Sequence, residues 1–104
     1  MTLGDWLRRR TPTPPVELSA RIQEALGDRW NADAADAPDL CVSAAEALLR
    51  ELTSRPSVGR EAALDLLTVD ALATYAFEAA SEHPESLADR TARAMTRLAA
   101  TAAP

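Results

Sequence analysis

Polar side chains recur at every fourth position of one segment, where they could form a binding site. Asp70, Thr74 and Glu78 have the spacing that places residues on one face of an α-helix, with Tyr75 and Phe77 beside them. If that face were buried, the two carboxylates would need partners and could line a polar ligand pocket or bind a cation. If it were open to solvent, they would form an ordinary surface ridge. The sequence leaves both interpretations open.

Residues suited to catalysis are few. The chain has one histidine, His83, and one cysteine, Cys41, so zinc sites built from these residue types are not expected. Ala80 stands three residues before His83, so the Glu-x-x-His pair of di-iron helical bundles is missing. His83 is expected at a cap or turn, and Cys41 is expected to pack as a small apolar side chain. We therefore expect no enzyme, no catalytic residue, no metal and no cofactor.

The clearest interaction candidate is a short amphipathic helix over residues 1–10, followed by a proline-rich hinge over 11–15. Thr2 and Asp5 have the spacing of a capping box at the start of this helix. The candidate interaction residues are Leu3, Trp6, Leu7, Arg8, Arg9 and Arg10. Such a segment can enter the groove of a partner protein or lie on an anionic membrane, although it is too short to anchor to lipid alone. Alternatively, its apolar side packs on the protein's own core.

Composition and charge restrict the class of protein. The hydrophobic fraction is 47%, dominated by Ala and Leu, and all basic residues are Arg, which gives an Ala/Arg-rich composition of bacterial type. Ala and Leu favour helix over strand. The net charge of −5 repels phosphate backbones, so nucleic-acid binding is not expected. No segment has the apolar length of a membrane span or the pattern of a secretory signal, which makes the cytoplasm the expected location.

Breaks in periodicity divide residues 16–102, which we expect to form a single helical domain. A second helix should begin with Thr13 as its cap and Pro14 at its first position, and Gly27 should end it. Residues 28–37 show no periodicity, so we expect a loop there that contains Trp30. Two further helices are expected at about 36–54 and 84–102. The apolar side of the last helix should consist of Leu87, Thr91, Met95, Leu98 and Ala102, with Arg97 on its outer face.

The longest expected helix covers about 58–82 and carries two apolar stripes on opposite sides. One stripe contains Ala62, Leu66, Val69, Ala73, Ala76 and Ala80, with Phe77 at its edge, and the other contains Leu64, Leu67, Ala71 and Tyr75. Asp70, Thr74 and Glu78 occupy one channel between the stripes, and Glu61 and Asp65 occupy the other. A helix of this kind normally lies at the centre of a bundle. The fold predicted is therefore all-α, a small four-to-five-helix bundle around this central helix.

One short segment resembles a known family. The residues Asp70-Ala-Leu-Ala-Thr-Tyr-Ala-Phe-Glu78 are similar to a helix of trans-polyprenyl diphosphate synthases with the pattern Gly-Asp-Ala-Leu-Leu-Thr-x-Ala-Phe-Glu. Val69 stands in place of the glycine, and the paired aspartate-rich motifs that hold magnesium and diphosphate in that family are absent. No catalytic residue carries over, and the resemblance suggests only an isoprenoid-type ligand.

These observations favour a function in protein–protein contact. Three amphipathic neighbours are too few to cover both stripes of the central helix, and an exposed apolar strip favours self-association as a dimer or a role as a small accessory subunit of another protein. The alternatives are a small-ligand or isoprenoid-type binding domain, with Asp70, Thr74 and Glu78 beside a pocket of Tyr75 and Phe77, and membrane-surface attachment through Trp6 and its arginines. The sequence does not identify the partner or the ligand.

Overall fold

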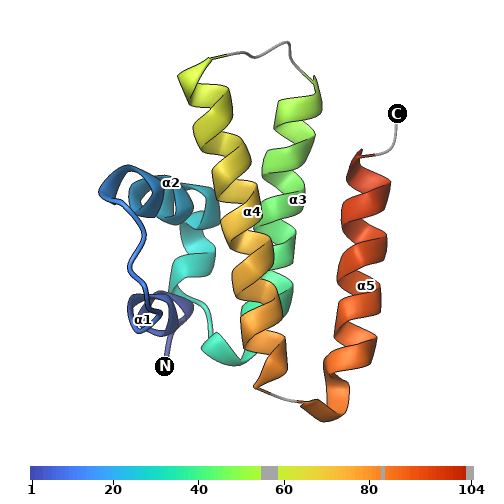
Figure 1. The fold of residues 1–104 in the computed structure, drawn as a ribbon. Helices are drawn as coiled ribbons and strands as arrows, with labels where there is room; N and C mark the ends of the chain where they lie inside the picture. Colours follow the sequence, from blue (N-terminus) through green and yellow to red (C-terminus); the bar gives the residue numbers. More distant parts are fainter. Residues whose placement is uncertain (55–58, 83, 103–104) are drawn as a thin grey trace.

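Helices make up most of the computed structural model, which describes residues 1–54, 59–82 and 84–102, without the side chains of 84–87 and 90 (Figure 1). In chain order they are α1 (Leu3–Arg8), α2 (Val16–Leu26), α3 (Ala37–Ser54), α4 (Arg60–Ser81) and α5 (Pro84–Ala102). Two short 3-10 helices, η1 (Gly27–Asn31) and η2 (Ala34–Asp36), connect α2 to α3. The all-α prediction is confirmed.

The antiparallel helices α3 and α4 lie side by side at the centre of the bundle (Figure 1). Helix α5 runs along one side of this pair, and α1 and α2 cover the other side. Because α4 contacts α2, α3 and α5, it is the long central helix that the sequence predicts. The radius of gyration is 13.4 Å, close to the value of about 13 Å expected for one folded domain of about 100 residues.

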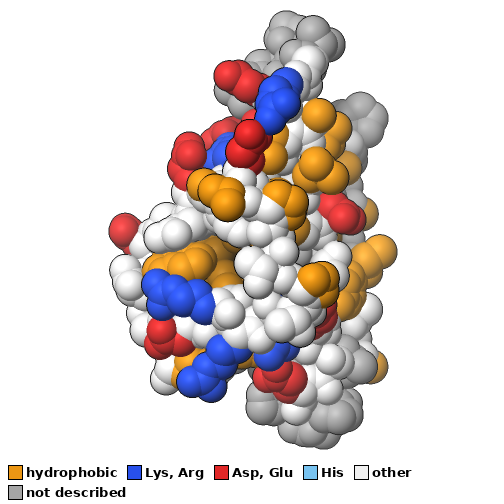
Figure 2. All heavy atoms as spheres, turned by 60° about the vertical axis from the view of Figure 1, so that its left-hand side comes forward, with side chains coloured by type: hydrophobic (Ala, Val, Ile, Leu, Met, Phe, Trp, Pro, Cys, Tyr) orange, Lys and Arg blue, Asp and Glu red, His pale blue; other side chains and the backbone are white. Residues whose placement is uncertain are grey.

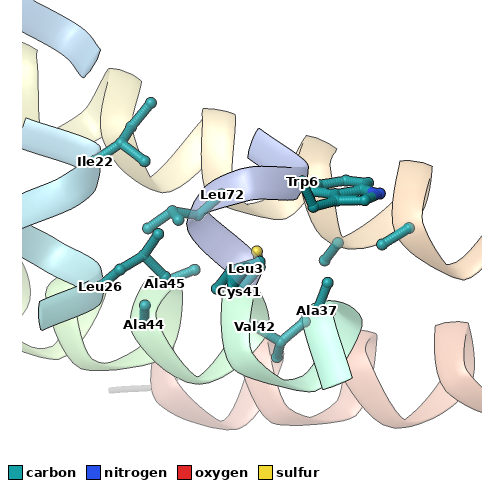
Figure 3. Close-up of a cluster of buried hydrophobic side chains, with 12 residues drawn as sticks. Leu3, Trp6, Ile22, Leu26, Ala37, Cys41, Val42, Ala44, Ala45 and Leu72 are labelled. Carbon is teal, nitrogen blue, oxygen red and sulfur yellow. The ribbon is translucent and has the colours of Figure 1, made fainter. Parts of the chain in front are cut away.

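The core draws on four helices and is built largely from small side chains (Figure 3). Its buried residues are Leu3, Trp6, Ile22, Leu26, Ala37, Cys41, Val42, Ala44, Ala45, Leu72, Ala76 and Ala79. Leu3 and Leu26 are fully buried, so α1 and α2 contribute large side chains to a centre in which α3 supplies mostly alanine. Burial of a leucine side chain stabilises the fold by about 1.5–3 kcal/mol, so α1 is an integral part of this core.

Proline and glycine positions account for most helix ends. Gly27 caps α2 with a φ of 54°, a conformation that glycine adopts without strain. The predicted start of α2 was wrong, because the helix begins at Val16 and no side chain caps it. Pro15 disfavours helical geometry in the residue before it, so Pro14 cannot be the first helical residue. The expected start of α4 at Val58 lies outside the described residues.

The side of α4 that is buried differs from the prediction. It runs through Asp65, Thr68 and Leu72, along one of the channels between the two predicted stripes. Only the nearer edges of the stripes are covered, and Leu66, Leu67 and Phe77 on their far edges are 55%, 56% and 37% exposed. The reason is that periodicity shows which residues share a face, but the position of α3 decides which face is buried.

Helix α5 is also rotated relative to the prediction. Ala94 and Leu98 pack against the core, whereas Met95 and Ala102, predicted to face inward, are exposed. Arg97, predicted on the outer face, is partly buried, and its Nε donates to Glu46 Oε2 at 3.2 Å. This ion pair joins α5 to α3. The side chain of Leu87 is outside the described part.

Candidate functional site

The short N-terminal helix packs on the core. Thr2 accepts a hydrogen bond from the backbone of Asp5, and the Asp5 carboxylate accepts one from the backbone of Thr2, which completes the predicted capping box. The backbone N–H of Leu3 donates to Ala32 O at 2.8 Å, and that of Ala34 donates to Met1 O at 3.0 Å. These bonds fasten α1 to the chain around η2. They resolve the alternative that the sequence left open.

The predicted interaction residues are therefore divided between the core and the surface. Leu3 and Trp6 are buried, Leu7 is partly buried, and Arg8 and Arg9 are exposed. Trp6 also makes an edge-to-face contact with another aromatic ring, with 6.3 Å between its ring centroid and that of Tyr75. The apolar residues that would enter a membrane or a partner's groove are thus packed in or against this protein's own core.

Two arginines of this segment lie over tryptophan rings. The Arg10 guanidinium lies 4.3 Å from the centroid of the Trp6 ring, and the Arg8 guanidinium lies 5.4 Å from that of Trp30. Both distances are within the range of a cation–π interaction. Trp6 Nε1 donates to Glu82 Oε1 at 3.0 Å, and Arg10 Nη1 reaches the same oxygen at 3.5 Å. Glu82 therefore ties the N-terminal segment to the end of α4.

A hollow of about 460 Å³ lies between this segment, α2, η1 and α4, and we call it the N-terminal pocket. Its apolar walls include Leu7, Pro14, Val16, Ile22, Trp30 and Tyr75. Its polar lining consists of Arg8, Arg10, Thr13, Ser19 and Gln23. A concave, mostly apolar lining with a few polar groups is typical of small-molecule sites, which measure roughly 300–1,000 Å³.

The N-terminal pocket combines residues from two separately predicted sets. Leu7, Arg8 and Arg10 come from the N-terminal interaction segment, and Tyr75 comes from the predicted ligand pocket on the long helix. Burial raises the pKa of Tyr75, and the nearby Glu78 carboxylate adds to this effect. The Tyr75 hydroxyl therefore stays protonated at neutral pH and can donate a hydrogen bond.

Trp30 is one of several pocket residues, most of the others in or next to α2, that the sequence analysis did not place in a site. It was assigned only to a loop, but its ring lies directly against Gly4, where a Cβ would overlap three atoms of the indole. The one available signal was a glycine inside the predicted first helix, since glycine there often allows another group to approach closely. That signal does not say which residue approaches.

The predicted polar ridge is open to solvent. Asp70, Thr74 and Glu78 are all exposed, and the Thr74 hydroxyl donates to the carbonyl oxygen of Asp70 in its own helix at 2.9 Å. Tyr75 and Phe77 do not share a pocket, because Phe77 borders a different hollow of about 60 Å³ between α3, α4 and α5. The predicted arrangement of carboxylates beside Tyr75 and Phe77 is therefore not formed.

An apolar groove of about 580 Å³ lies between α2 and the start of α4, and we call it the α2–α4 face. Its apolar residues are Pro15, Val16, Leu18, Ala63, Leu64 and Leu67, and its charged residues are Glu17 and Arg60. Val16 is 85% exposed and Leu67 is 56% exposed. On this side of the molecule, hydrophobic side chains lie exposed between acidic and basic ones (Figure 2).

Reactive and metal-binding groups are scarce in the described part of the chain. Burial raises the pKa of the Cys41 thiol to about 12, so this side chain is protonated and packs as an apolar residue, as predicted. No group of three or more His, Cys, Asp or Glu residues in 1–54, 59–82 and 84–102 is arranged to hold a metal ion. The predicted junction residue His83 lies outside these ranges.

Comparison with known proteins gives no assignment: the chain matches no family model, no curated protein and no solved structure. Within the described ranges, none of the helices combines the length and the apolar character needed to cross a bilayer.

Proposed function

We propose that this protein acts through protein–protein contact and that it forms a homodimer through the α2–α4 face. The observation that carries the proposal is the exposure of large apolar side chains around a groove, with Val16 at 85% and Leu67 at 56%. Contiguous apolar surface on a small domain commonly marks an interaction site, because covering it removes unfavourable contact with water.

The shape and charge of the face fit a second copy of the chain. A twofold dimer brings the same patch together from both partners, so the patch must be complementary to itself. This face contains both a groove and protruding residues, Val16 and Leu67, that can enter the groove of the other copy. It also holds one acid and one base, Glu17 and Arg60, whose Oε2 and Nη2 atoms are 2.6 Å apart within the monomer.

The net charge supports the choice of this face. Each copy carries a charge of −5, so two copies repel each other wherever acidic surfaces meet. On the α2–α4 face one acid balances one base, which makes it a neutral surface on an acidic molecule. A stable dimer needs roughly 800 Å² from each partner. That is about one eighth of the 6312 Å² of accessible surface of the described chain.

The test compares two leucines of matched exposure. Leu67→Gln removes an apolar contact from the groove, and Leu66→Gln makes the same change at the neighbouring position, which is 55% exposed and does not line the groove. Sedimentation equilibrium should show a dimer for the wild type at micromolar concentration. Because symmetry repeats each substitution, Leu67→Gln should weaken dimerisation by at least about tenfold, and Leu66→Gln should change it by less than about twofold.

A wild type that stays monomeric throughout this concentration range would overturn the proposal. Equal weakening by both substitutions would show that the association is not centred on the groove. Thermal unfolding of each variant controls for a loss of folding, which is not expected because both side chains are more than half exposed.

Small-ligand binding is the second candidate function, and the N-terminal pocket supports it. Membrane attachment has less support, since Leu3 and Trp6 would first have to leave the core. We also propose the cytoplasm as the compartment. A lone cysteine, which forms no disulfide within the chain, is compatible with a reducing environment.

A further inference from the structure

The polar groups of the N-terminal pocket include two arginines and no acidic residue of the described chain. Arg8 and Arg10 therefore bring positive charge to a hollow in a protein whose net charge is −5. Guanidinium groups bind carboxylates and phosphates with paired, charge-assisted hydrogen bonds. The lining thus favours an anionic group at this position.

Arg10 has an unused donor. Its Nε is buried, and no hydrogen-bond acceptor contacts it within the described chain. Its Nη1 is 3.5 Å from Glu82 Oε1, at the outer limit of a hydrogen bond, and that oxygen already accepts from Trp6 at 3.0 Å. A buried N–H without an acceptor destabilises the structure. Because Nε is itself buried, a ligand in the pocket would pair with it only if the Arg10 guanidinium turned.

The remainder of the pocket is suited to an apolar body. Leu7, Ile22 and the rings of Trp30 and Tyr75 form its walls, and the Tyr75 hydroxyl can add a second donor. A volume of about 460 Å³ is within the range of sites for small organic molecules, roughly 300–1,000 Å³. The ligand therefore combines one charged end with an apolar chain or ring.

The pairing of the two lining arginines indicates a single negative charge. Arg8 Nη1 is already paired with Asp5 Oδ1 at 3.1 Å, whereas Arg10 Nη1 is 3.5 Å from Glu82 Oε1. One weakly paired guanidinium suits a monoanion better than a phosphate dianion. We propose that the N-terminal pocket binds a small apolar monocarboxylate, such as a medium-chain fatty acid or an arylalkanoic acid. The proposal is independent of dimerisation, because the pocket and the α2–α4 face share only Val16.

The first experiment titrates the wild-type protein with decanoate and with decanol, which share an alkyl chain and differ in charge. Trp30 lines the pocket, so the intrinsic tryptophan fluorescence reports binding, and calorimetry gives the stoichiometry. Decanoate should bind saturably with one site per chain. Decanol should bind at least about tenfold more weakly, since it cannot form the charge-assisted hydrogen bonds. Phenylbutyrate in place of decanoate distinguishes an aryl from an alkyl ligand.

The second experiment compares neighbouring arginines. Arg10→Gln removes the guanidinium that lines the pocket, and Arg9→Gln removes the same charge from an exposed position that does not line it. We expect Arg10→Gln to weaken decanoate binding by at least about tenfold and Arg9→Gln to weaken it by less than about twofold. Circular dichroism confirms that each variant is folded.

Several results would overturn the proposal. They are the absence of saturable binding of both decanoate and phenylbutyrate, equal affinity for decanoate and decanol, or equal loss of affinity in the two variants. The comparison of decanoate with decanol uses only the wild-type protein, so it decides the question even if Arg10→Gln does not fold.

Discussion

Replacement of Asp65 by alanine should destabilise the fold strongly. Asp65 Oδ1 accepts a hydrogen bond from Arg21 Nε at 2.7 Å, and the two side chains are only 9% and 18% exposed. The substitution leaves the Arg21 guanidinium with little access to water and with only a longer contact to a carboxylate, 3.6 Å from Nη1 to Glu24 Oε1, whose side chain is 76% exposed. Breaking a buried ion pair by removing one partner costs about 3–5 kcal/mol. For a domain of this size that loss lowers Tm by roughly 10–25 °C.

A second ion pair between the same two helices provides the control. Arg60 Nη2 and Glu17 Oε2 are 2.6 Å apart and also join α4 to α2, but their side chains are 82% and 65% exposed. At protein concentrations below those that form the proposed dimer, where this pair is open to water, Glu17→Ala should therefore cost less than about 1 kcal/mol, as exposed pairs usually do. The two variants remove the same kind of contact from the same helix pair, so the difference between them isolates the effect of burial.

Urea denaturation followed by circular dichroism measures both free energies of unfolding. A double replacement, Arg21→Met with Asp65→Leu, should recover much of the loss, because an apolar pair needs no counter-charge. If Asp65→Ala and Glu17→Ala had equal effects, our interpretation of the Arg21–Asp65 contact as a buried ion pair would be refuted.

Three further predictions address other features. Gly4→Ala places a Cβ in the space filled by the Trp30 ring, so it should lower stability by about 1–3 kcal/mol and change the fluorescence of the folded state; a Tm equal to or above that of the wild type would contradict this. The Cys41 thiol, whose pKa burial raises to about 12, should react with DTNB only after unfolding, and stoichiometric labelling of the native protein would contradict this. A hydrogen bond from the Thr2 backbone lowers the pKa of Asp5 below its ordinary value of 3.8, so its stabilisation is present above that pH and is lost as the pH falls through the lowered pKa. The Tm values of the wild type and Asp5→Asn should therefore differ at about pH 7 and converge near about pH 2, and a constant difference would contradict this.

Helix ends were predictable because they depend on local chemistry. The Thr2–Asp5 capping box, the end of α2 at Gly27 and the start of α5 at Pro84 each follow from one or two residues. Proline restricts the backbone dihedral angles and glycine widens their allowed range in any tertiary structure. The positions of these residues could therefore be interpreted without knowledge of their neighbours in the fold.

The choice of buried face was not predictable in the same way. The first apolar stripe of α4 carries buried alanines on its inner edge and the exposed Leu66 and Phe77 on its outer edge, so hydrophobicity alone favoured the wrong side. Asp65 belongs to the buried side because Arg21, which is 44 residues away in the chain, balances its charge. Such a pair has no local signal in one sequence.

The candidate site was predicted in fragments. Sequence analysis identified Leu7, Arg8, Arg10 and Tyr75 but placed them in two separate sites, because nothing local indicates that α1 lies beside the C-terminal half of α4. Trp30 completes the pocket through its contact with Gly4, and this contact also depends on tertiary packing.

The hydrogen bond from Trp6 to Glu82 joins residues that are 76 positions apart. A ribosome adds Trp6 to the chain 76 residues before Glu82, so α1 leaves the exit tunnel well before its docking partner does. Closing a loop of this length costs chain entropy before the contact can stabilise the fold. Until Glu82 is synthesised, the N-terminal segment can be held only by contacts such as the backbone bonds of Leu3 and Ala34 to the chain around η2.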